Sequence, residues 1–443
     1  MPDPRPNLIF ILADDLGYAD LGCMGARDAA NQPVDVSPRL DRMAAEGLRF
    51  TRGYANSAVC SPTRFALVTG RYQYRLRGAA EEPLAAAHGD KVLGLPPAHP
   101  TLPSLLKGAG YATALVGKWH LGYPPHFGPR LSGYEEFWGF HAGGADYFSH
   151  LDPRGNHDLW ENETEIHREG YLTDLLSARA VDYIERQSAE QPFLLSLHYS
   201  APHWPWLTRE DAAESARIGA GLKHLDGGSL ATYQKMITQM DEGIGQVLDA
   251  LARRGLADNT LVVFTSDNGG ERFSNNWPFV GGKMDLLEGG LRVPLLARWP
   301  ARIAAGGVSD RPNMTMDWTA TFLDGAGVAP HPDHPLDGQS LLPHFADPAA
   351  PAPERDLFWR MKHRGQRALL RGDWKYLRQD GNEFLFDVVT DPRERANQAR
   401  RQPERLAELR AAWEALDAQM PPIPDEARVS LVFGPKDLPQ ATF

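Results

Sequence analysis

Apolar runs alternate with amphipathic stretches along the first three quarters of the chain. Four runs have little polar interruption within their apolar part: NLIFILADD (7–15), YATALVGKWH (111–120), PFLLSLHYSAPH (192–203) and TLVVFTSDNGG (260–270). Apolar residues recur at helical spacing in SPRLDRMAAEGL (37–48), YLTDLLSARAVDYIERQ (171–187) and LATYQKMITQMDEGIGQVLDALARRG (230–255). Continuous apolar strands separated by helices predict an α/β fold, with a large mainly parallel or mixed sheet that helices cover on both faces.

The pattern changes after an Ala/Pro-rich stretch, ADPAAPAPERD, at 346–356. This composition is typical of a linker. Beyond it, RALLRGDWKYLRQ (367–379) and EFLFDVVT (383–390) predict short strands, and QPERLAELRAAWEALDAQM (402–420) predicts a helix. We therefore expect a main domain over 1–350 and a C-terminal α+β subdomain over 351–443, with a small antiparallel sheet and a helix.

Composition and charge restrict the class of protein. The chain has 443 residues, of which 42% are hydrophobic and 23% charged, and its formal net charge is −11. A negative surface argues against nucleic acid or an anionic membrane as the main partner. The N-terminal apolar run, Leu8 to Ala13, is six residues long and ends in two aspartates, unlike a signal peptide. We expect a cytoplasmic protein with no membrane partner.

Polar residues follow two of the predicted strands. Asp14 and Asp15 come directly after the first, and Asp267 and Asn268 after the strand at 261–266. Each pair alone is better explained as a turn, because Asp, Asn and Gly are common turn residues. In parallel sheets, however, ligands bind beyond the carboxyl ends of the strands. Three carboxylates and one amide oxygen form a ligand set that suits Ca²⁺ or Mg²⁺ better than Zn²⁺.

One of the two cysteines precedes a predicted helix in VCSPTRFALVTGRY (59–72). Ser61 is a suitable N-cap, Gly70 would end the helix, and Arg64 lies one turn in. A helix N-terminus favours an anion close to Cys60. Two other interpretations are a small buried core residue and a disulfide with Cys23, although two cysteines in a chain of this length are no disulfide framework.

Cationic and imidazole side chains occur at the ends of other predicted strands. Lys118 and His120 are two residues apart, so on a strand they would point to one face. His203 follows the strand at 192–198, and Lys283 lies in a glycine-rich loop. Singly, these residues are explained as a core histidine or a solvated lysine. Together with the acid pairs and Cys60 they indicate an anion site beside a cation.

At these positions the chain resembles the type I, formylglycine-dependent sulfatases of the alkaline phosphatase superfamily, and is arylsulfatase-like. CSPTR (60–64) matches their Cys-x-Pro-x-Arg signature, whose cysteine is converted to formylglycine after synthesis. The resemblance implies an alkaline phosphatase-like fold, with the catalytic domain over 1–350. The matching motifs run in order from residue 7 to about 397: LADDLGY, CSPTR and GRY, GKWHLG, the His203 segment, TSDNGG, LLEGGLRVP, DGQSLLP and GDWKYL with FDVVTDPRERAN.

The resemblance also implies a role for each candidate residue. Arg64 would hold the helix turn and the formylglycine hydrate, and His120 would hydrogen-bond one hydroxyl of that hydrate. The sulfate oxygens would be bound by Lys118, His203 and Lys283. A divalent cation, Ca²⁺ with Mg²⁺ as the alternative, would be bound by Asp14, Asp15, Asp267, Asn268 and the modified Cys60. A formylglycine-generating maturation enzyme is the implied partner.

The implied reaction converts a small sulfate monoester to an alcohol or phenol and inorganic sulfate. One hydroxyl of the hydrated aldehyde, deprotonated with help from Asp267, attacks sulfur and displaces the alcohol. His203, with Lys283 nearby, would protonate the leaving oxygen. The second hydroxyl then loses its proton towards His120, and expulsion of sulfate regenerates the aldehyde. The thiol of Cys60 is therefore a precursor and not itself the nucleophile.

Several alternatives stay open at this point. Phosphonate and phosphate ester hydrolases of the superfamily share the signature, but phosphonate monoester hydrolases differ from this chain at Lys118 and Asn268. A non-catalytic binder of sulfated ligands is a second alternative, and a structural metal-binding protein a third, although the latter leaves His203 and both lysines unexplained. An aryl sulfate is the default substrate, partly as a convention of the resemblance. Three aromatic-rich pieces could wall a pocket for an aryl group or equally belong to the core: EEFWGFHAGGADYFSH, PHWPW and NNWPF.

Overall fold

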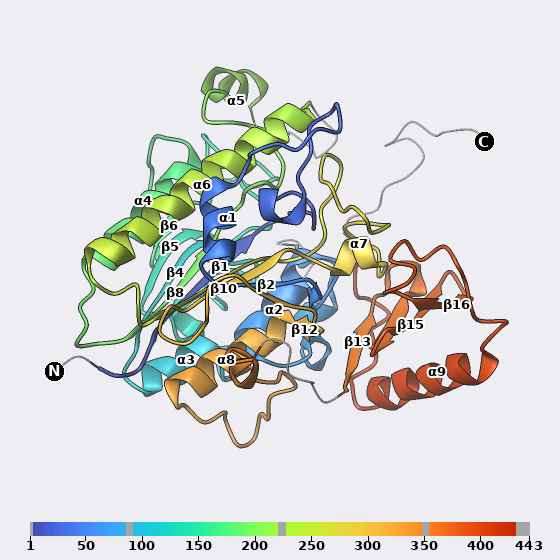
Figure 1. Cartoon of the computed structure of the whole chain (residues 1–443). Helices are drawn as coiled ribbons and strands as arrows, with labels where there is room; N and C mark the ends of the chain where they lie inside the picture. Colours follow the sequence, from blue (N-terminus) through green and yellow to red (C-terminus); the bar gives the residue numbers. More distant parts are fainter. Residues whose placement is uncertain (1–2, 86–91, 220–226, 348–353, 431–443) are drawn as a thin grey trace.

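The centre of the molecule is a ten-stranded mixed sheet in the order β11-β2-β10-β9-β1-β8-β4-β5-β6-β7 (Figure 1). This computed structural model describes residues 3–85, 92–219, 227–347 and 354–430. The central strands β9, β1, β8, β4 and β5 are parallel, whereas β10, β6 and β7 run antiparallel to neighbours. The strands of this sheet are β1 (Asn7–Ala13), β2 (Leu48–Phe50), β4 (Ala112–Lys118), β5 (Glu136–Phe140), β6 (Trp160–Glu161), β7 (Thr164–Glu165), β8 (Phe193–His198), β9 (Thr260–Ser266), β10 (Leu295–Arg298) and β11 (Gly307–Ser309).

Helices cover both faces of the sheet, as the sequence predicts. Alternate residues of β1 point to opposite faces, so Ile9 packs in one hydrophobic cluster and Phe10 in another. The first cluster includes residues of α1, α4 and α6, and the second residues of α2, α3 and α8. The predicted fold class is therefore confirmed. The helices are α1 (Pro38–Ala45), α2 (Cys60–Thr69), α3 (Leu102–Gly108), α4 (Leu172–Glu185), α5 (Ala212–Ile218), α6 (Leu230–Arg253), α7 (Glu288–Leu291), α8 (Thr315–Ala326) and α9 (Pro403–Asp417).

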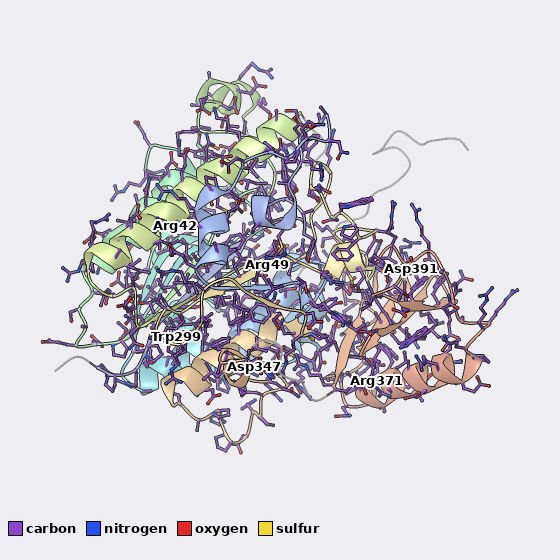
Figure 2. The ribbon with its side chains drawn as sticks, viewed as in Figure 1. Arg42, Arg49, Trp299, Asp347, Arg371 and Asp391 are labelled. Atoms are coloured by element: carbon purple, nitrogen blue, oxygen red, sulfur yellow. The ribbon has the colours of Figure 1, made fainter. Side chains whose placement is uncertain are left out.

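A second, four-stranded antiparallel sheet lies in the C-terminal part of the chain, with α9 packed against it. Arg371 of β14, which is labelled in Figure 2, connects the elements of this unit. It forms ion pairs with Asp356 of β13 (2.6 Å) and with Glu408 of α9 (2.7 Å). The strands are β13 (Asp356–Arg360), β14 (Arg367–Arg371), β15 (Trp374–Gln379) and β16 (Asn382–Asp387), and a separate pair is formed by β3 (Gly53–Tyr54) and β12 (Asn313–Met314). The small sheet and helix agree with the predicted elements, and β13 is a strand that the sequence pattern missed.

Helix α2 lies between the main sheet and the C-terminal sheet. All ten of its residues are buried. Phe65 belongs to the cluster under the main sheet, whereas Cys60 and Ala66 belong to the cluster that includes Leu369 and Tyr376 of the C-terminal sheet. Part of the predicted linker, residues 348–353, lies outside the described residues, and the division into domains at residue 350 stays a proposal.

Within the described parts of the chain, none of the helices combines the length and the apolar character that a membrane crossing needs.

Candidate active site

Four polar residues follow directly on two neighbouring parallel strands. The last residues of β1 and β9 are register partners, so Asp14–Asp15 and Asp267–Asn268 leave the sheet side by side at its carboxyl edge. The Asp15 N–H donates to Asp267 Oδ1 (3.3 Å), and the Asn268 amide donates to Asp15 Oδ1 (2.7 Å). All four side chains are buried. The structure therefore brings the two predicted acidic strand ends into one cluster.

Helix α2 places Cys60 at its first position, which corrects the predicted helix start. Val59, with φ −152° and ψ 149°, occupies the N-cap place that the sequence assigned to Ser61. The Ser61 hydroxyl instead accepts a hydrogen bond from the Leu84 N–H (2.7 Å). The helix therefore starts at Cys60, and the Ser61 side chain is not available as its cap. The predicted end is confirmed, since Gly70 adopts the left-handed conformation (φ 65°) after the last helical residue.

The Cys60 thiol faces the acidic cluster. Its sulfur and one carboxylate oxygen each from Asp14 and Asp267 all lie within 4.8 Å of one another. Burial raises the pKa of the Cys60 thiol to about 11, although two nearby lysines oppose the shift. The thiol is therefore protonated at neutral pH and a weak nucleophile. Cys23 and Cys60 are both free, so the disulfide interpretation is wrong.

Arg64 connects helix α2 to two strand ends. Its guanidinium is fully buried and donates through Nε to Asp267 Oδ2 (3.0 Å) and through Nη1 to the Lys118 carbonyl (3.3 Å). Nη2 lies 3.8 Å from Asp14 Oδ1. A buried guanidinium is stable only where its charge is compensated. Arg64 therefore orients the two carboxylates nearest Cys60.

The predicted shared strand face of Lys118 and His120 is wrong, but both side chains reach the site. β4 ends at Lys118, whose Nζ lies 2.5 Å from Asp14 Oδ2. His120 has a left-handed φ of 57° and therefore lies in the loop after the strand. Its Nε2 is 2.7 Å from the Leu84 carbonyl, which assigns the proton to Nε2. Nδ1 is buried with no hydrogen-bond partner among the described residues.

His203 and Lys283 approach the acidic cluster from two other loops. Lys283 Nζ donates to Asp15 Oδ2 (2.6 Å), and His203 Nε2 lies 3.6 Å from the same oxygen. The Nδ1 of His203 is 2.6 Å from the Trp204 carbonyl, so it carries the proton and leaves Nε2 as the acceptor. Burial and the charge of Lys283 lower the pKa of His203. Burial disfavours the charged form of Lys283 and lowers its pKa. The negative charges of Asp15 and Glu271 outweigh this effect, so the pKa of Lys283 lies above its ordinary value.

The acidic cluster has oxygen atoms that no protein group satisfies. Among the described residues, Asp14 Oδ1 and Asn268 Oδ1 are buried without a hydrogen-bond partner. The Asn268 NH₂ group donates to Asp15 and to the Gly269 carbonyl (2.9 Å), so the amide oxygen is the free atom. Burial, together with the charge of Asp267, raises the pKa of Asp14. Unpaired buried oxygens and crowded carboxylates fit a hard divalent cation such as Ca²⁺ or Mg²⁺.

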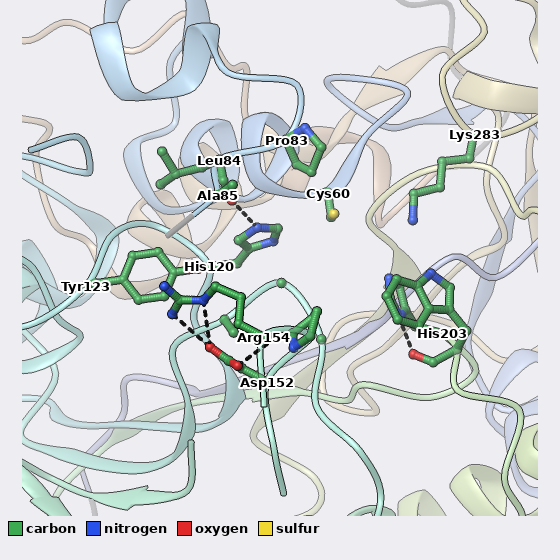
Figure 3. A pocket seen from close by; sticks show the side chains of 15 residues that line it. Cys60, Pro83, Leu84, Ala85, His120, Tyr123, Asp152, Arg154, His203 and Lys283 are labelled. Carbon is green, nitrogen blue, oxygen red and sulfur yellow. Dashed lines mark hydrogen bonds and ion pairs between the residues drawn. The ribbon is translucent and has the colours of Figure 1, made fainter. Parts of the chain in front are cut away.

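A cavity of about 260 Å³ adjoins Cys60 (Figure 3). On one wall Arg154 donates through Nε (3.1 Å) and Nη2 (2.8 Å) to Asp152 Oδ2. Of the aromatic-rich pieces, Trp204 lines the cavity, whereas Trp138 and Tyr147 are buried in the core. The lining residues are Cys60, Pro83, Leu84, Ala85, His120, Tyr123, Ala142, Gly143, Gly144, Asp152, Pro153, Arg154, His203, Trp204 and Lys283.

Two glycines in the cavity wall have a role that the sequence pattern did not reveal. A Cβ on Gly143 would lie 2.6 Å from the His120 ring, and one on Gly144 would lie 3.2 Å from the His203 ring. The Gly143–Gly144 pair therefore leaves room for both imidazoles. The sequence pattern did not reveal Asp152 and Arg154, because the turn that carries them does not follow a predicted strand. Nothing in the local sequence indicates that this turn lies at the cavity.

Comparison with known proteins decides the family. A family model described as Sulfatase matches residues 6–328. The chain belongs to the sulfatase family. The human N-acetylgalactosamine-6-sulfatase is 36% identical to this sulfatase over 363 residues, which cover 77% of the chain but 66% of the human enzyme. The N-acetylgalactosamine-6-O-sulfatase of Bacteroides thetaiotaomicron is 27% identical, with 93% of each chain covered.

A solved structure extends the likeness over nearly the whole sulfatase. The crystal structure of Ps i-CgsB in complex with k-i-k-neocarrahexaose has a TM-score of 0.83 and 30% sequence identity, and 94% of each chain is covered. The predicted family and fold are therefore confirmed. The family suggests a metal and a formylglycine, and two groups of side chains in the site could hold a metal ion: Asp14, Asp15 and His203, and Asp14, Cys60 and Asp267.

The geometry predicts that Ca²⁺ stabilises the folded sulfatase through Asp14. Ca²⁺ at 100 times its dissociation constant should raise the free energy of unfolding by about 2.7 kcal/mol, because only the folded chain assembles the oxygen cluster. Asp14→Asn should weaken Ca²⁺ binding by at least about 10-fold, because it removes a carboxylate charge from the ligand set. Calorimetric titration and denaturant unfolding measure both quantities. Asp333→Asn, at an exposed carboxylate, is the control; equal Ca²⁺ affinity in the two variants would contradict the assignment.

Proposed function

We propose that this sulfatase hydrolyses sulfate monoesters to an alcohol or phenol and inorganic sulfate, with Cys60 in its formylglycine form. The observation that carries the proposal is the position of Cys60, at the N-terminus of α2, beside Asp14 and Asp267 and on the same cavity as His203 and Lys283. The hydrated aldehyde supplies two hydroxyl groups on one carbon, one to attack sulfur and one to expel sulfate. A formylglycine-generating enzyme is the proposed maturation partner.

Lys118, Lys283 and His203 would bind the sulfate oxygens. Each lysine already contacts one carboxylate, Asp14 at 2.5 Å and Asp15 at 2.6 Å. An ammonium carries three protons, so each lysine can keep its carboxylate and still donate to sulfate. The N-terminal N–H groups of α2 add a partial positive charge on the same side. Donors held in a dry site stabilise the charge that develops on the oxygens of the transition state.

The cation would be held by Asp14, Asp15, Asp267, Asn268 and residue 60, and we propose Ca²⁺, with Mg²⁺ as the alternative. When bound, this ion supplies Lewis acidity that favours deprotonation at residue 60 and offsets negative charge.

Three side chains would move the protons. Asp267, oriented by Arg64 at 3.0 Å, would accept the proton of the attacking hydroxyl. The anionic ester would raise the pKa of His203, so that Nε2 becomes protonated and donates to the leaving oxygen. His120, whose Nε2 is held by the Leu84 carbonyl, would accept the proton of the second hydroxyl at its unpartnered Nδ1.

The first test is the chemical state of residue 60. Peptide mass analysis of active enzyme should find the aldehyde form in place of the thiol. Cys60→Ala should lower kcat/KM by roughly 10³-fold or more, because it removes the nucleophile. Cys23→Ala is the matched control, since Cys23 is also a free cysteine and lies outside the cavity lining. Full turnover by a preparation that contains only unmodified Cys60 would refute the proposal.

The second test separates proton donation by His203 from sulfate binding. A general acid typically contributes ~10²–10⁴-fold, and its contribution grows with the charge on the leaving oxygen. His203→Ala should therefore lower kcat/KM far more for an alkyl sulfate than for nitrophenyl sulfate. A plot of log kcat/KM against leaving-group pKa should be steeper for the variant, and His126→Ala, at an exposed histidine, should leave the plot unchanged. Parallel lines would make His203 a binding residue and implicate Lys283.

Within sulfate monoesters we propose a sulfated sugar as the substrate class. The cavity lining includes the Asp152–Arg154 pair, and two N–H donors of Arg154 contact Asp152. The remaining donors of a guanidinium can bind sugar hydroxyls. The proposal is supported by the two related N-acetylgalactosamine sulfatases and by the neocarrahexaose bound to Ps i-CgsB.

Arg154→Ala tests the substrate class. The change should lower kcat/KM for N-acetylgalactosamine 6-sulfate by about 10–100-fold, the cost of one to two lost hydrogen bonds to a charged group. Turnover of nitrophenyl sulfate, which has no sugar hydroxyls, should change by less than about 3-fold. Arg401→Ala, at an exposed arginine in the C-terminal part, is the control. Equal losses on both esters would argue against a sugar contact and leave the hydrolysis of sulfate esters untouched.

A further inference from the structure

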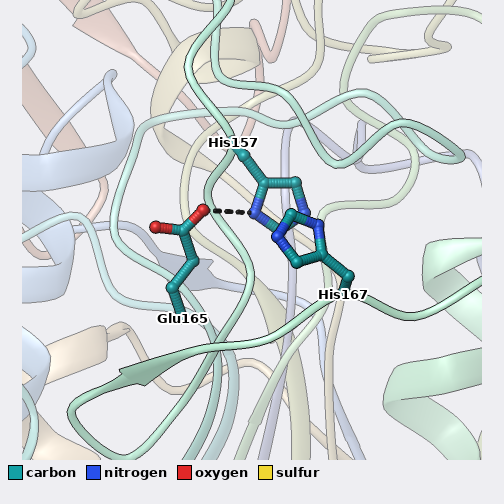
Figure 4. Close-up of side chains that lie close together, drawn as sticks. All are labelled: His157, Glu165 and His167. Carbon is teal, nitrogen blue, oxygen red and sulfur yellow. Dashed lines mark hydrogen bonds and ion pairs between the residues drawn. The ribbon is translucent and has the colours of Figure 1, made fainter.

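A second group of metal-binding side chains lies outside the acidic cluster, at the β6–β7 hairpin. His157 comes three residues before β6, Glu165 is the last residue of β7, and His167 lies two residues after Glu165. Figure 4 shows the two imidazoles and the carboxylate turned towards one another. One donor atom from each residue lies within 4.8 Å of the other two. The reaction proposed above uses none of the three.

The distances are close to those of a bound transition metal. His157 Nδ1 lies 3.0 Å from Glu165 Oε1, and the rings of His157 and His167 are 4.1 Å apart between centroids. Ligand atoms around a tetrahedral Zn²⁺ with bonds of ~2.1 Å lie roughly 3.4 Å apart. Glu165 and His167 are exposed, so small side-chain rotations can close the difference.

The charges around the hairpin single out Glu165. Glu161 pairs with Arg179 (2.9 Å), and Glu163 pairs with Arg130 (2.9 Å). Within the described residues, the ion pair of Glu165 is with His157 and with no lysine or arginine. The Glu165 carboxylate thus faces imidazole rings, whereas the other two carboxylates of the hairpin each face an arginine. A metal ion bound by the carboxylate and the imidazoles would supply a permanent positive charge at this position.

A third imidazole lies behind His157. The His150 ring is 6.4 Å from the His157 ring, is 1% exposed, and its Nε2 has no hydrogen-bond partner among the described residues. An unpartnered buried nitrogen next to the cluster adds a further potential nitrogen donor.

We propose that His157, Glu165 and His167 form a second metal site, which takes a transition metal such as Zn²⁺. Two imidazole nitrogens and one carboxylate are a set that suits Zn²⁺, whereas the all-oxygen set at Asp14 and Asp267 suits Ca²⁺. With three protein ligands, the site keeps at least one position for water. The site does not depend on the reaction proposed for Cys60.

The position of this site gives it a link to the substrate cavity. Leu151 and His157 form an antiparallel bridge, and the turn between them carries Asp152 and Arg154. Asp158, the next residue, accepts hydrogen bonds from the N–H groups of His141 and Ala142, next to the glycine pair. A metal ion at His157 would therefore tie the base of the Arg154 turn to β7 and hold one wall of the cavity in place.

Metal titration tests the site without any activity measurement. Untagged full-length protein, kept in excess Ca²⁺ to fill the oxygen cluster, is titrated with Zn²⁺ by calorimetry and with Co²⁺ by visible absorption. The wild type should bind one Zn²⁺ tightly, and Co²⁺ should give the d–d bands of a low-coordinate nitrogen and oxygen site. The double variant His157→Gln/His167→Gln should bind at least about 30-fold more weakly, and Glu165→Gln about 10-fold more weakly, since each loses ligands or charge.

A matched histidine pair provides the control. His331 and His334 lie 5.3 Å apart between ring centroids, but His334 Nδ1 is 3.0 Å from Arg71, whose charge opposes a metal ion. His331→Gln/His334→Gln should leave Zn²⁺ binding unchanged, and Asp14→Asn should also leave it unchanged. The proposed site would be overturned if the wild type did not bind Zn²⁺. It would also be overturned if the His157→Gln/His167→Gln variant bound Zn²⁺ as tightly as the wild type and unfolded in the same transition.

Discussion

The balance of buried charge at the carboxyl edge of the main sheet is the constraint on which the site depends. Three carboxylates and three cationic side chains are buried there, and each of them forms an ion pair with at least one of the others. Buried charges are tolerated only when they are paired, so removal of Arg64 or Lys283 would leave a buried carboxylate without its arginine or lysine. The cations come from α2, the end of β4 and a glycine-rich loop, which the cluster therefore holds together. The six residues are Asp14, Asp15, Arg64, Lys118, Asp267 and Lys283.

The C-terminal sheet supports the same cluster from behind. Gln366, which is 1% exposed, donates to the Met284 carbonyl (2.8 Å) and accepts from the Leu286 N–H (2.8 Å). Met284 has a φ of 76°, a strained conformation for a residue with a side chain, and its N–H donates to the Ala58 carbonyl (2.7 Å). These bonds fix the loop that carries Lys283 against the segment that leads to Cys60. The C-terminal unit therefore positions Lys283, a lysine of the main part of the chain that faces the acidic cluster.

Much of the fold and the chemistry of the site could be predicted from local patterns. An apolar run such as Asn7–Ala13 is a strand buried on both faces, and the aspartates that follow must lie at its carboxyl end. The same argument places Asp267 and Asn268, and parallel pairing of the two strands brings both acid pairs together. The turn residue Gly70 likewise marked the end of α2 correctly.

The sequence by itself thus determined the α/β class, the strand ends that carry the acidic cluster, and the family motif around Cys60. Only the tertiary structure decided the left-handed turn at His120, the helix start after Val59 and the position of Arg154 on the cavity wall. It also brought His157 and His167 together across a hairpin. The physical reason is the range of the contacts. Strand and helix periodicity reflect burial of neighbouring residues, whereas loop conformations and wall residues are set by contacts between segments that lie far apart in the chain.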